Sequence, residues 1–235
     1  MKKTIILNHK MNLDYDMVYP YIESINNVDT DMSLIVCPSN IYLENFINNC
    51  SWGVGAQDVF YEESGNYTGE VSTIQLKSLG VEYSIIGHDE RRKITKETVD
   101  IINKKLIACL ESNIQPILCF GSTGNISDIE EELDGLLKDV NNINFIIFAY
   151  EPMDVKNIQS LDDINDNINS IYDYLYEKYQ VKPFIIYGGG VNKDNVKEIL
   201  DISLIDGVII GSMSSDFKKI KEVIDVCGEN EEEVN

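Results

Sequence analysis

The stretch Tyr83-Ser84-Ile85-Ile86-Gly87-His88-Asp89-Glu90 joins a short apolar run directly to a glycine, a histidine and two carboxylates. An apolar run of this length is typical of a parallel strand that is buried on both faces. Similar runs recur along the chain, and they predict eight strands: Thr4–Asn8, Ser33–Cys37, Trp52–Gln57, Tyr83–Gly87, Gln115–Phe120, Phe145–Tyr150, Pro183–Tyr187 and Gly207–Gly211.

Amphipathic stretches that predict helices lie between these runs, for example Thr98–Glu111, Asp128–Val140, Leu161–Tyr179 and Lys193–Leu200. Strands and helices in alternation predict either a (β/α)8 barrel or a doubly wound sheet, and periodicity alone does not choose between them. Polar residues or glycines follow most of the strands. In a barrel all strand ends meet on one face, whereas in a doubly wound sheet they meet only at the switch point. We therefore predict an α/β fold, a single-domain barrel over residues 1–227, followed by an acidic, disordered tail over 228–235.

Composition excludes several classes of function. The chain has 235 residues and a net charge of −21, which disfavours nucleic acids and anionic membranes as partners. Its five cysteines are odd in number and show no CxxC or CxxH pairing, so we expect free thiols in the cytoplasm and no metal. No apolar run is long enough for a membrane span or a secretory signal.

Seven motifs, in order along the chain, resemble those of the triosephosphate isomerase family, which has a TIM-barrel fold. They are Asn8-His9-Lys10-Met11-Asn12, Gly55–Val59 with Gly65–Ser72, Ile86–Arg92, Pro116–Gly121, Ala149–Pro152, Tyr187–Val191, and Asp206-Gly207 with Ile210-Gly211. The resemblance implies an isomerase that interconverts glyceraldehyde 3-phosphate and dihydroxyacetone phosphate through an enediolate, without a cofactor.

The resemblance also implies catalytic roles. Glu151 matches the carboxylate base, His88 the neutral imidazole that polarises the carbonyl, and Lys10 the cation that holds the anionic substrate. Asn8 matches a polar contact from the first strand. These roles are physically coherent, because removing a carbon-bound proton needs a desolvated base, an electrophile at the carbonyl oxygen and a fixed positive charge.

Further residues match supporting positions of the family. The resemblance implies that the substrate phosphate is bound by Gly189, Gly190, Gly211 and Ser212, and that Glu90 and Asp89 lie behind the catalytic side chains, with Glu90 contacting the lysine. Thr68, within the loop Gly65–Ser72, matches a tip that inserts into a neighbouring subunit. We therefore expect a homodimer.

The chain departs from the family around the phosphate. The segment Pro152–Gln159 lacks the tryptophan and both glycines of the family lid and is shorter, and Ser122 replaces a glutamate that contacts that lid. Gly190 replaces a serine, Ser212 a glycine, and Asp89 a serine beside the catalytic histidine. Two alternatives therefore stay open, an isomerase of another small ketose phosphate and an inactive paralogue with a binding role. The retained catalytic residues favour an active enzyme.

Overall fold

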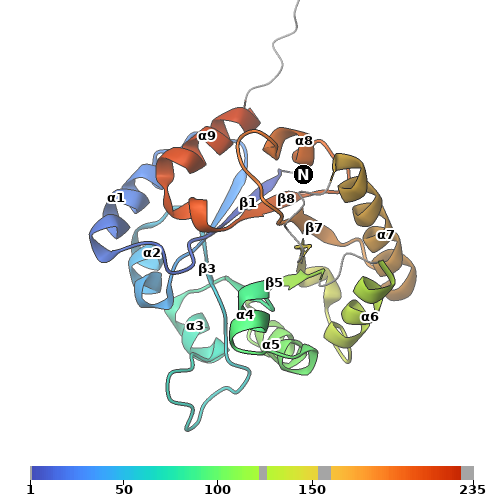
Figure 1. The fold of residues 1–235 in the computed structure, drawn as a ribbon. Coiled ribbons are helices and arrows are strands. Elements are labelled where there is room, and N and C mark those ends of the chain that lie inside the picture. The colour runs from blue at the N-terminus through green and yellow to red at the C-terminus, as the bar shows by residue number, and fades with distance from the viewer. Residues whose placement is uncertain (1, 122–125, 153–159, 229–235) are drawn as a thin grey trace, which may run out of the picture.

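The computed structural model describes residues 2–121, 126–152 and 160–228 (Figure 1). Its strands form one closed, fully parallel barrel in sequence order. They are β1 (Thr4–Asn8), β2 (Ser33–Cys37), β3 (Gly53–Ala56), β4 (Tyr83–Ile86), β5 (Gln115–Phe120), β6 (Ile147–Tyr150), β7 (Phe184–Tyr187) and β8 (Gly207–Ile210). The predicted fold class is confirmed, and the doubly wound alternative is wrong because β8 pairs with β1.

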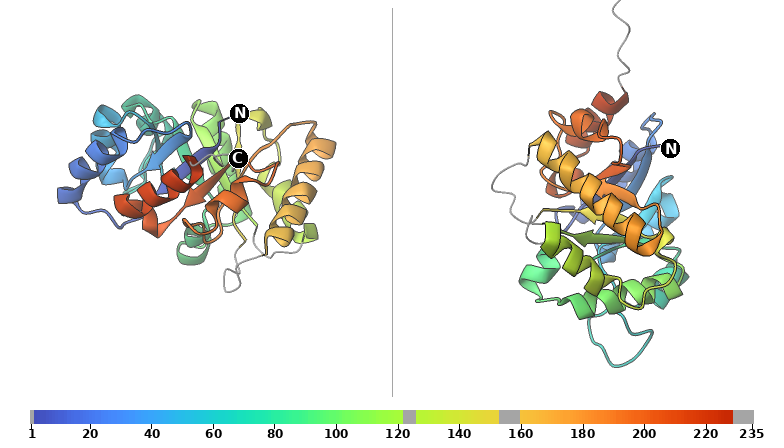
Figure 2. Two further views of the ribbon diagram at one scale, coloured as in Figure 1. Left: turned by 90° about the horizontal axis from the view of Figure 1, so that it is seen from above. Right: turned by 90° about the vertical axis from the view of Figure 1, so that its right-hand side faces the viewer.

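Helices surround the barrel on its outside (Figures 1 and 2). The described α-helices are α1 (Tyr15–Asn26), α2 (Leu43–Asn49), α3 (Thr73–Leu79), α4 (Asp89–Ile94), α5 (Val99–Glu111), α6 (Ile126–Leu136), α7 (Leu161–Tyr179), α8 (Val196–Leu200) and α9 (Phe217–Gly228). Short 3-10 helices are η1 (Asn40–Tyr42), η2 (Ile143–Phe145) and η3 (Ser212–Ser215). Gly228 ends α9, and the rest of the predicted tail lies outside the described residues.

Several predicted boundaries were wrong, each for a local reason. The sixth strand begins at Ile147 rather than Phe145, because Phe145 closes η2 with a backbone hydrogen bond to Asn142. The helix predicted over Asp128–Val140 ends at Leu136, and Asp139 beyond it adopts a left-handed φ of 58°. Apolar periodicity does not report such turns.

The last predicted helix also starts late. It begins at Val196 rather than Lys193, because Asn192 and Asn195 accept hydrogen bonds from nearby backbone N–H groups. Asparagine side chains offer the backbone this alternative to a helical turn.

The core has two layers, which explains the continuous apolar runs. Ile5 and Leu7 of β1 pack outward against helices, whereas Ile6 between them belongs to a separate cluster of buried residues with Ile85 and Ile117. Alternate residues of each strand thus face the barrel interior and the helix layer, and both sets are buried. Among the described residues, no helix is long and apolar enough to cross a membrane.

The segment between β3 and α3 projects away from the barrel (Figures 1 and 2). Its base is closed by a bridge between Phe60 and Ser72, and the Phe60 ring packs against Tyr67 at 4.7 Å between centroids. Ser72 then starts α3 with a capping box that involves Gln75. The loop that the sequence associates with a partner subunit is therefore an ordered projection.

Candidate active site

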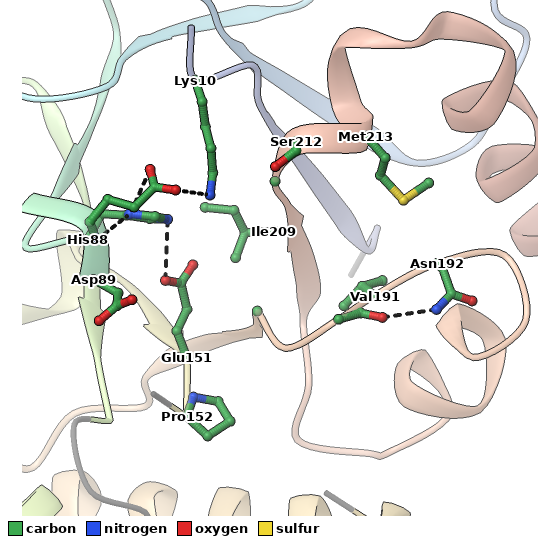
Figure 3. Close-up of a pocket in the computed structure, with 14 residues that line it drawn as sticks. Lys10, His88, Asp89, Glu151, Pro152, Val191, Asn192, Ile209, Ser212 and Met213 are labelled. Carbon is green, nitrogen blue, oxygen red and sulfur yellow. Dashed lines mark hydrogen bonds and ion pairs between the residues drawn. The ribbon is translucent and has the colours of Figure 1, made fainter. Parts of the chain in front are cut away.

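A cavity of about 460 Å³ opens at the carboxyl ends of the strands. Residues that follow β1, β4, β6, β7 and β8 line it (Figure 3). Lys10, His88 and Glu151 enter it from three different strand ends, far apart in the chain. This convergence is what the barrel topology provides, because parallel closure places every strand end on the same face.

Hydrogen bonds hold Lys10 in an unusual backbone conformation. Its φ of 52° lies in the left-handed region, which costs free energy for a residue with a side chain. The backbone N–H of Lys10 donates to Asn8 Oδ1 at 3.2 Å, and its carbonyl accepts from Ser39 and Gln57. The ammonium then reaches Glu90 Oε1 at 2.6 Å. Asn8 is buried and lines a neighbouring cavity of about 300 Å³ rather than the main one.

The tautomer of His88 follows from its hydrogen bond. Its Nδ1 accepts from the backbone N–H of Glu90 at 3.2 Å, so a neutral ring carries its proton on Nε2. Nε2 faces Glu151 Oε2 across 3.6 Å (Figure 3). Burial, followed by the positive charge of Lys10, lowers the pKa of His88 below its ordinary value. The ring is therefore a neutral donor aimed into the cavity.

Glu151 is desolvated. Its side chain is 14% exposed, and burial raises its pKa to about 8; Lys10 opposes the rise, and Asp89 and Glu90 add to it. A carboxylate in such surroundings is a strong base once it is ionised. Gly188 is required beside it, because a Cβ there would lie 2.6 Å from Glu151 Cγ.

The predicted phosphate-binding residues separate into two groups. Gly190, Gly211 and Ser212 line the cavity, and Ser212 lies on the side away from His88 (Figure 3). Gly189 is buried beneath it instead, where a Cβ would lie 2.3 Å from the hydroxyl of Tyr187. Val191, Asn192 and Met213 also line the cavity, and sequence reasoning missed them. Their one signal was their place next to the glycine motifs.

The remaining predicted residues are divided between the cavity, the protein surface and the parts of the chain that the structure does not describe. Thr68 is exposed on the β3–α3 projection. Within the lid segment Pro152–Gln159, Pro152 lines the cavity, and residues 153–159 lie outside the described residues, as does Ser122. Asp89 and Glu90 both line the cavity.

A barrel that gathers a desolvated carboxylate, a neutral imidazole and an ammonium belongs to the class of enzymes that move protons on small anionic substrates. The family model described as triosephosphate isomerase matches residues 3–227. The triosephosphate isomerase of Endomicrobium trichonymphae is 31% identical, over 95% of this chain and 98% of its own length. That of Mycoplasma genitalium is 33% identical over 93% and 96%, and that of Thermodesulfovibrio yellowstonii 31% over 95% and 98%. The chain belongs to the triosephosphate isomerase family.

The buried Glu151 predicts a pH-dependent stability. Its folded pKa of about 8 lies above the ordinary value of 4.5. The contribution of Glu151 to the free energy of unfolding is therefore fully present below pH 4.5 and is lost as the pH rises through about 8. The loss is on the order of 5 kcal/mol at most, given a folded pKa of about 8. Glu151→Gln, which has no charge to bury, should become more stable than the wild type by a margin that grows over this range.

Thermal unfolding of both proteins from pH 5 to 9 measures the margin. Glu44→Gln removes an exposed carboxylate from α2 and serves as the control, with no such trend expected. A constant difference between Glu151→Gln and the wild type would show that Glu151 is not costly to ionise.

Proposed function

We propose that this protein interconverts glyceraldehyde 3-phosphate and dihydroxyacetone phosphate, as its family membership implies, and so serves glycolysis. The observation that carries the proposal is the arrangement of Glu151, His88 and Lys10 around one cavity. Each has the protonation or charge that the reaction needs: a strong base, a neutral donor and a fixed cation.

The geometry supports the following sequence of steps. The ionised Glu151 removes the proton from the carbon next to the carbonyl, while His88 Nε2–H donates a hydrogen bond to the carbonyl oxygen. Electrons move onto that oxygen, and the ammonium of Lys10 stabilises the resulting enediolate. The hydroxyl proton of the substrate then passes to the former carbonyl oxygen by way of His88 Nε2, and Glu151 returns its proton to the adjacent carbon. Both protons stay in the product, so the reaction needs no cofactor.

The phosphate end of the substrate fits the opposite side of the cavity. Gly190, Gly211 and Ser212 present backbone there with little side-chain bulk. Lys10 is the one cation among the described residues that line the cavity, in a chain of net charge −21. Backbone N–H groups are therefore the donors we assign to the phosphate, because they bind anions without adding charge.

The two alternatives from the sequence are not favoured. An inactive paralogue would have no need for the strained backbone of Lys10 or for a buried, ionisable Glu151. The match of the triosephosphate isomerase family model to residues 3–227 favours a triose phosphate over another ketose phosphate. We also infer a cytoplasmic location, supported by five cysteines that are all free thiols.

We further propose a homodimer. Large apolar side chains are exposed where the chain leaves β1, β2 and α4: Met11 is 91% exposed, Ile41 77% and Ile94 76%. Tyr67, next to Thr68 on the projecting loop, is 44% exposed. Exposed apolar side chains of this size are typical of a surface that a partner covers. A second copy of the chain would supply both the projection and the cavity beside Asn8 that receives it.

The first test is turnover. The purified protein should convert glyceraldehyde 3-phosphate to dihydroxyacetone phosphate, and Glu151→Gln should reduce kcat by roughly 10²- to 10⁴-fold, the usual contribution of a positioned base. A coupled assay with NADH measures both. Full turnover by the Gln variant would refute the base assignment, and an inactive wild type would refute the proposed reaction.

The altered lid predicts a slower reaction that also forms a side product. Pro152–Gln159 lacks the family's glycines, so we expect one backbone hydrogen bond to the phosphate to be lost. One charge-assisted hydrogen bond is worth roughly ten- to a hundredfold. We expect kcat/KM below the diffusion ceiling of ~10⁸–10⁹ M⁻¹s⁻¹ and some release of methylglyoxal from the enediolate. Glu151→Gln, which forms no enediolate, gives the background rate. Turnover at the ceiling without methylglyoxal would contradict this.

The homodimer predicts a single species of twice the monomer mass at micromolar concentration. Thr68→Arg should shift it toward monomer, because a charge would be buried in the interface. Asn169→Arg adds the same charge on the exposed face of α7 and should leave the mass unchanged. Sedimentation velocity distinguishes these outcomes, and a monomeric wild type would exclude the dimer.

A further inference from the structure

A second, much smaller cavity lies behind Glu151, between the ends of β4, β5 and β6. It measures about 10 Å³, and its charged lining consists of Asp89, Arg92, Glu132 and Glu151. Three carboxylates and one guanidinium therefore meet in a space of about one water molecule. When all are ionised, their charges sum to −2.

The guanidinium in this group is already engaged. Arg92 donates through Nε to the carbonyl of Gly87 at 2.6 Å and through Nη2 to that of Cys119 at 2.9 Å, and Nη1 pairs with Glu132 at 2.7 Å. Glu132 also accepts from the backbone N–H of Gly121. Arg92 is thus balanced by Glu132, which is 5% exposed, and two carboxylates remain across the cavity from each other.

Asp89 is only partly neutralised. Its Oδ2 pairs with Lys93 at 2.7 Å, but the Lys93 side chain is 58% exposed and solvent screens its charge. Its Oδ1 is buried and has no hydrogen-bond partner among the described residues. A buried carboxylate oxygen without a donor keeps its negative field, and that field acts on whatever charge lies beyond the cavity.

We propose that Asp89 is a positioning residue for the proton transfer, which makes Glu151 a stronger base by placing a second negative charge across this cavity. The proposal deepens the proposed isomerase function and rests on it. Asp89 stays outside the reacting atoms: it lies beside His88, at the first position of α4, and acts through Glu151.

The other groups that face Glu151 do not replace this effect. Lys10 and Arg92 act in the opposite direction and lower its pKa. Glu90 raises it, but that carboxylate is 48% exposed and paired with Lys10. From β5, the Cys119 thiol is buried and hydrogen-bonded to Glu151, and burial keeps its pKa high, so the thiol is neutral. Asp89 is the remaining carboxylate that shares both cavities with Glu151.

The consequence for the reaction is a balance. A stronger base removes a weakly acidic carbon-bound proton more readily, but a smaller fraction of it is ionised at neutral pH. With Asp89 present, activity should therefore rise with pH to a high plateau. Without its charge, the rise should occur at lower pH and lead to a lower plateau.

The test compares Asp89→Asn and Asp89→Ser with the wild type. In each variant the acid limb of kcat/KM should move down by about one pH unit, the usual effect of a nearby like charge. Asp89→Glu keeps the charge and should keep the wild-type limb. Asp201→Asn removes an exposed carboxylate beyond α8, before β8 and so at the other end of the barrel, and is the matched control. A merely structural role would change the rate without moving the limb.

A readout without turnover separates this proposal from the proposed function. Glutamate labelled with ¹³C at the carboxyl carbon titrates in the NMR spectrum, and Glu151→Gln identifies the signal of Glu151. That signal should titrate at lower pH in Asp89→Asn and in Asp89→Ser. Unchanged titration in both would overturn the role of Asp89 even in an active enzyme. An inactive wild type would overturn the isomerase function, and the shift of the NMR titration would still decide the role of Asp89.

Discussion

Closure of the barrel between β8 and β1 is the constraint on which the rest depends. Thr4 pairs with Gly207, and a Cβ at Gly207 would lie 2.1 Å from the Thr4 carbonyl oxygen, so only glycine lets the two strands approach. Closure places Lys10, which follows β1, against Gly211, which follows β8, with 3.2 Å between the Lys10 side chain and a Cβ at Gly211. A cation and the turn to which we assign the substrate phosphate therefore meet although about two hundred residues separate them.

The helix α4, which His88 caps, is held from outside by a network of ion pairs. Arg91 of α4 pairs with Asp58 and Glu97, and the buried Lys105 of α5 pairs with the same two carboxylates. Removing one member would leave a buried charge without its partner, and this cost keeps the members of the network together. The network leaves the ring of His88 little freedom, so its orientation is settled before substrate binds.

The sequence predicted the fold and the strand ends well, because parallel strands buried on both faces leave a strong apolar signal and their polar ends stand out against it. It predicted less well what depends on contacts between distant segments. The pairing of Arg92 with Glu132 joins α4 to α6, and no local pattern reports it. His9 is a further example: it is fully buried, edge-on to Tyr21 at 4.5 Å, and burial lowers its pKa to about 4.

These contacts explain how an acidic protein can use a general base to remove a proton from an anionic substrate. Surface carboxylates are screened by solvent and barely affect the site, whereas a carboxylate in a small buried cavity is screened much less. Lys10 is paired with Glu90 and Arg92 with Glu132, so neither cation fully neutralises Glu151. The basicity of Glu151 is therefore set first by its burial and then by the few charges that share its surroundings, and the net charge of −21 has little part in it.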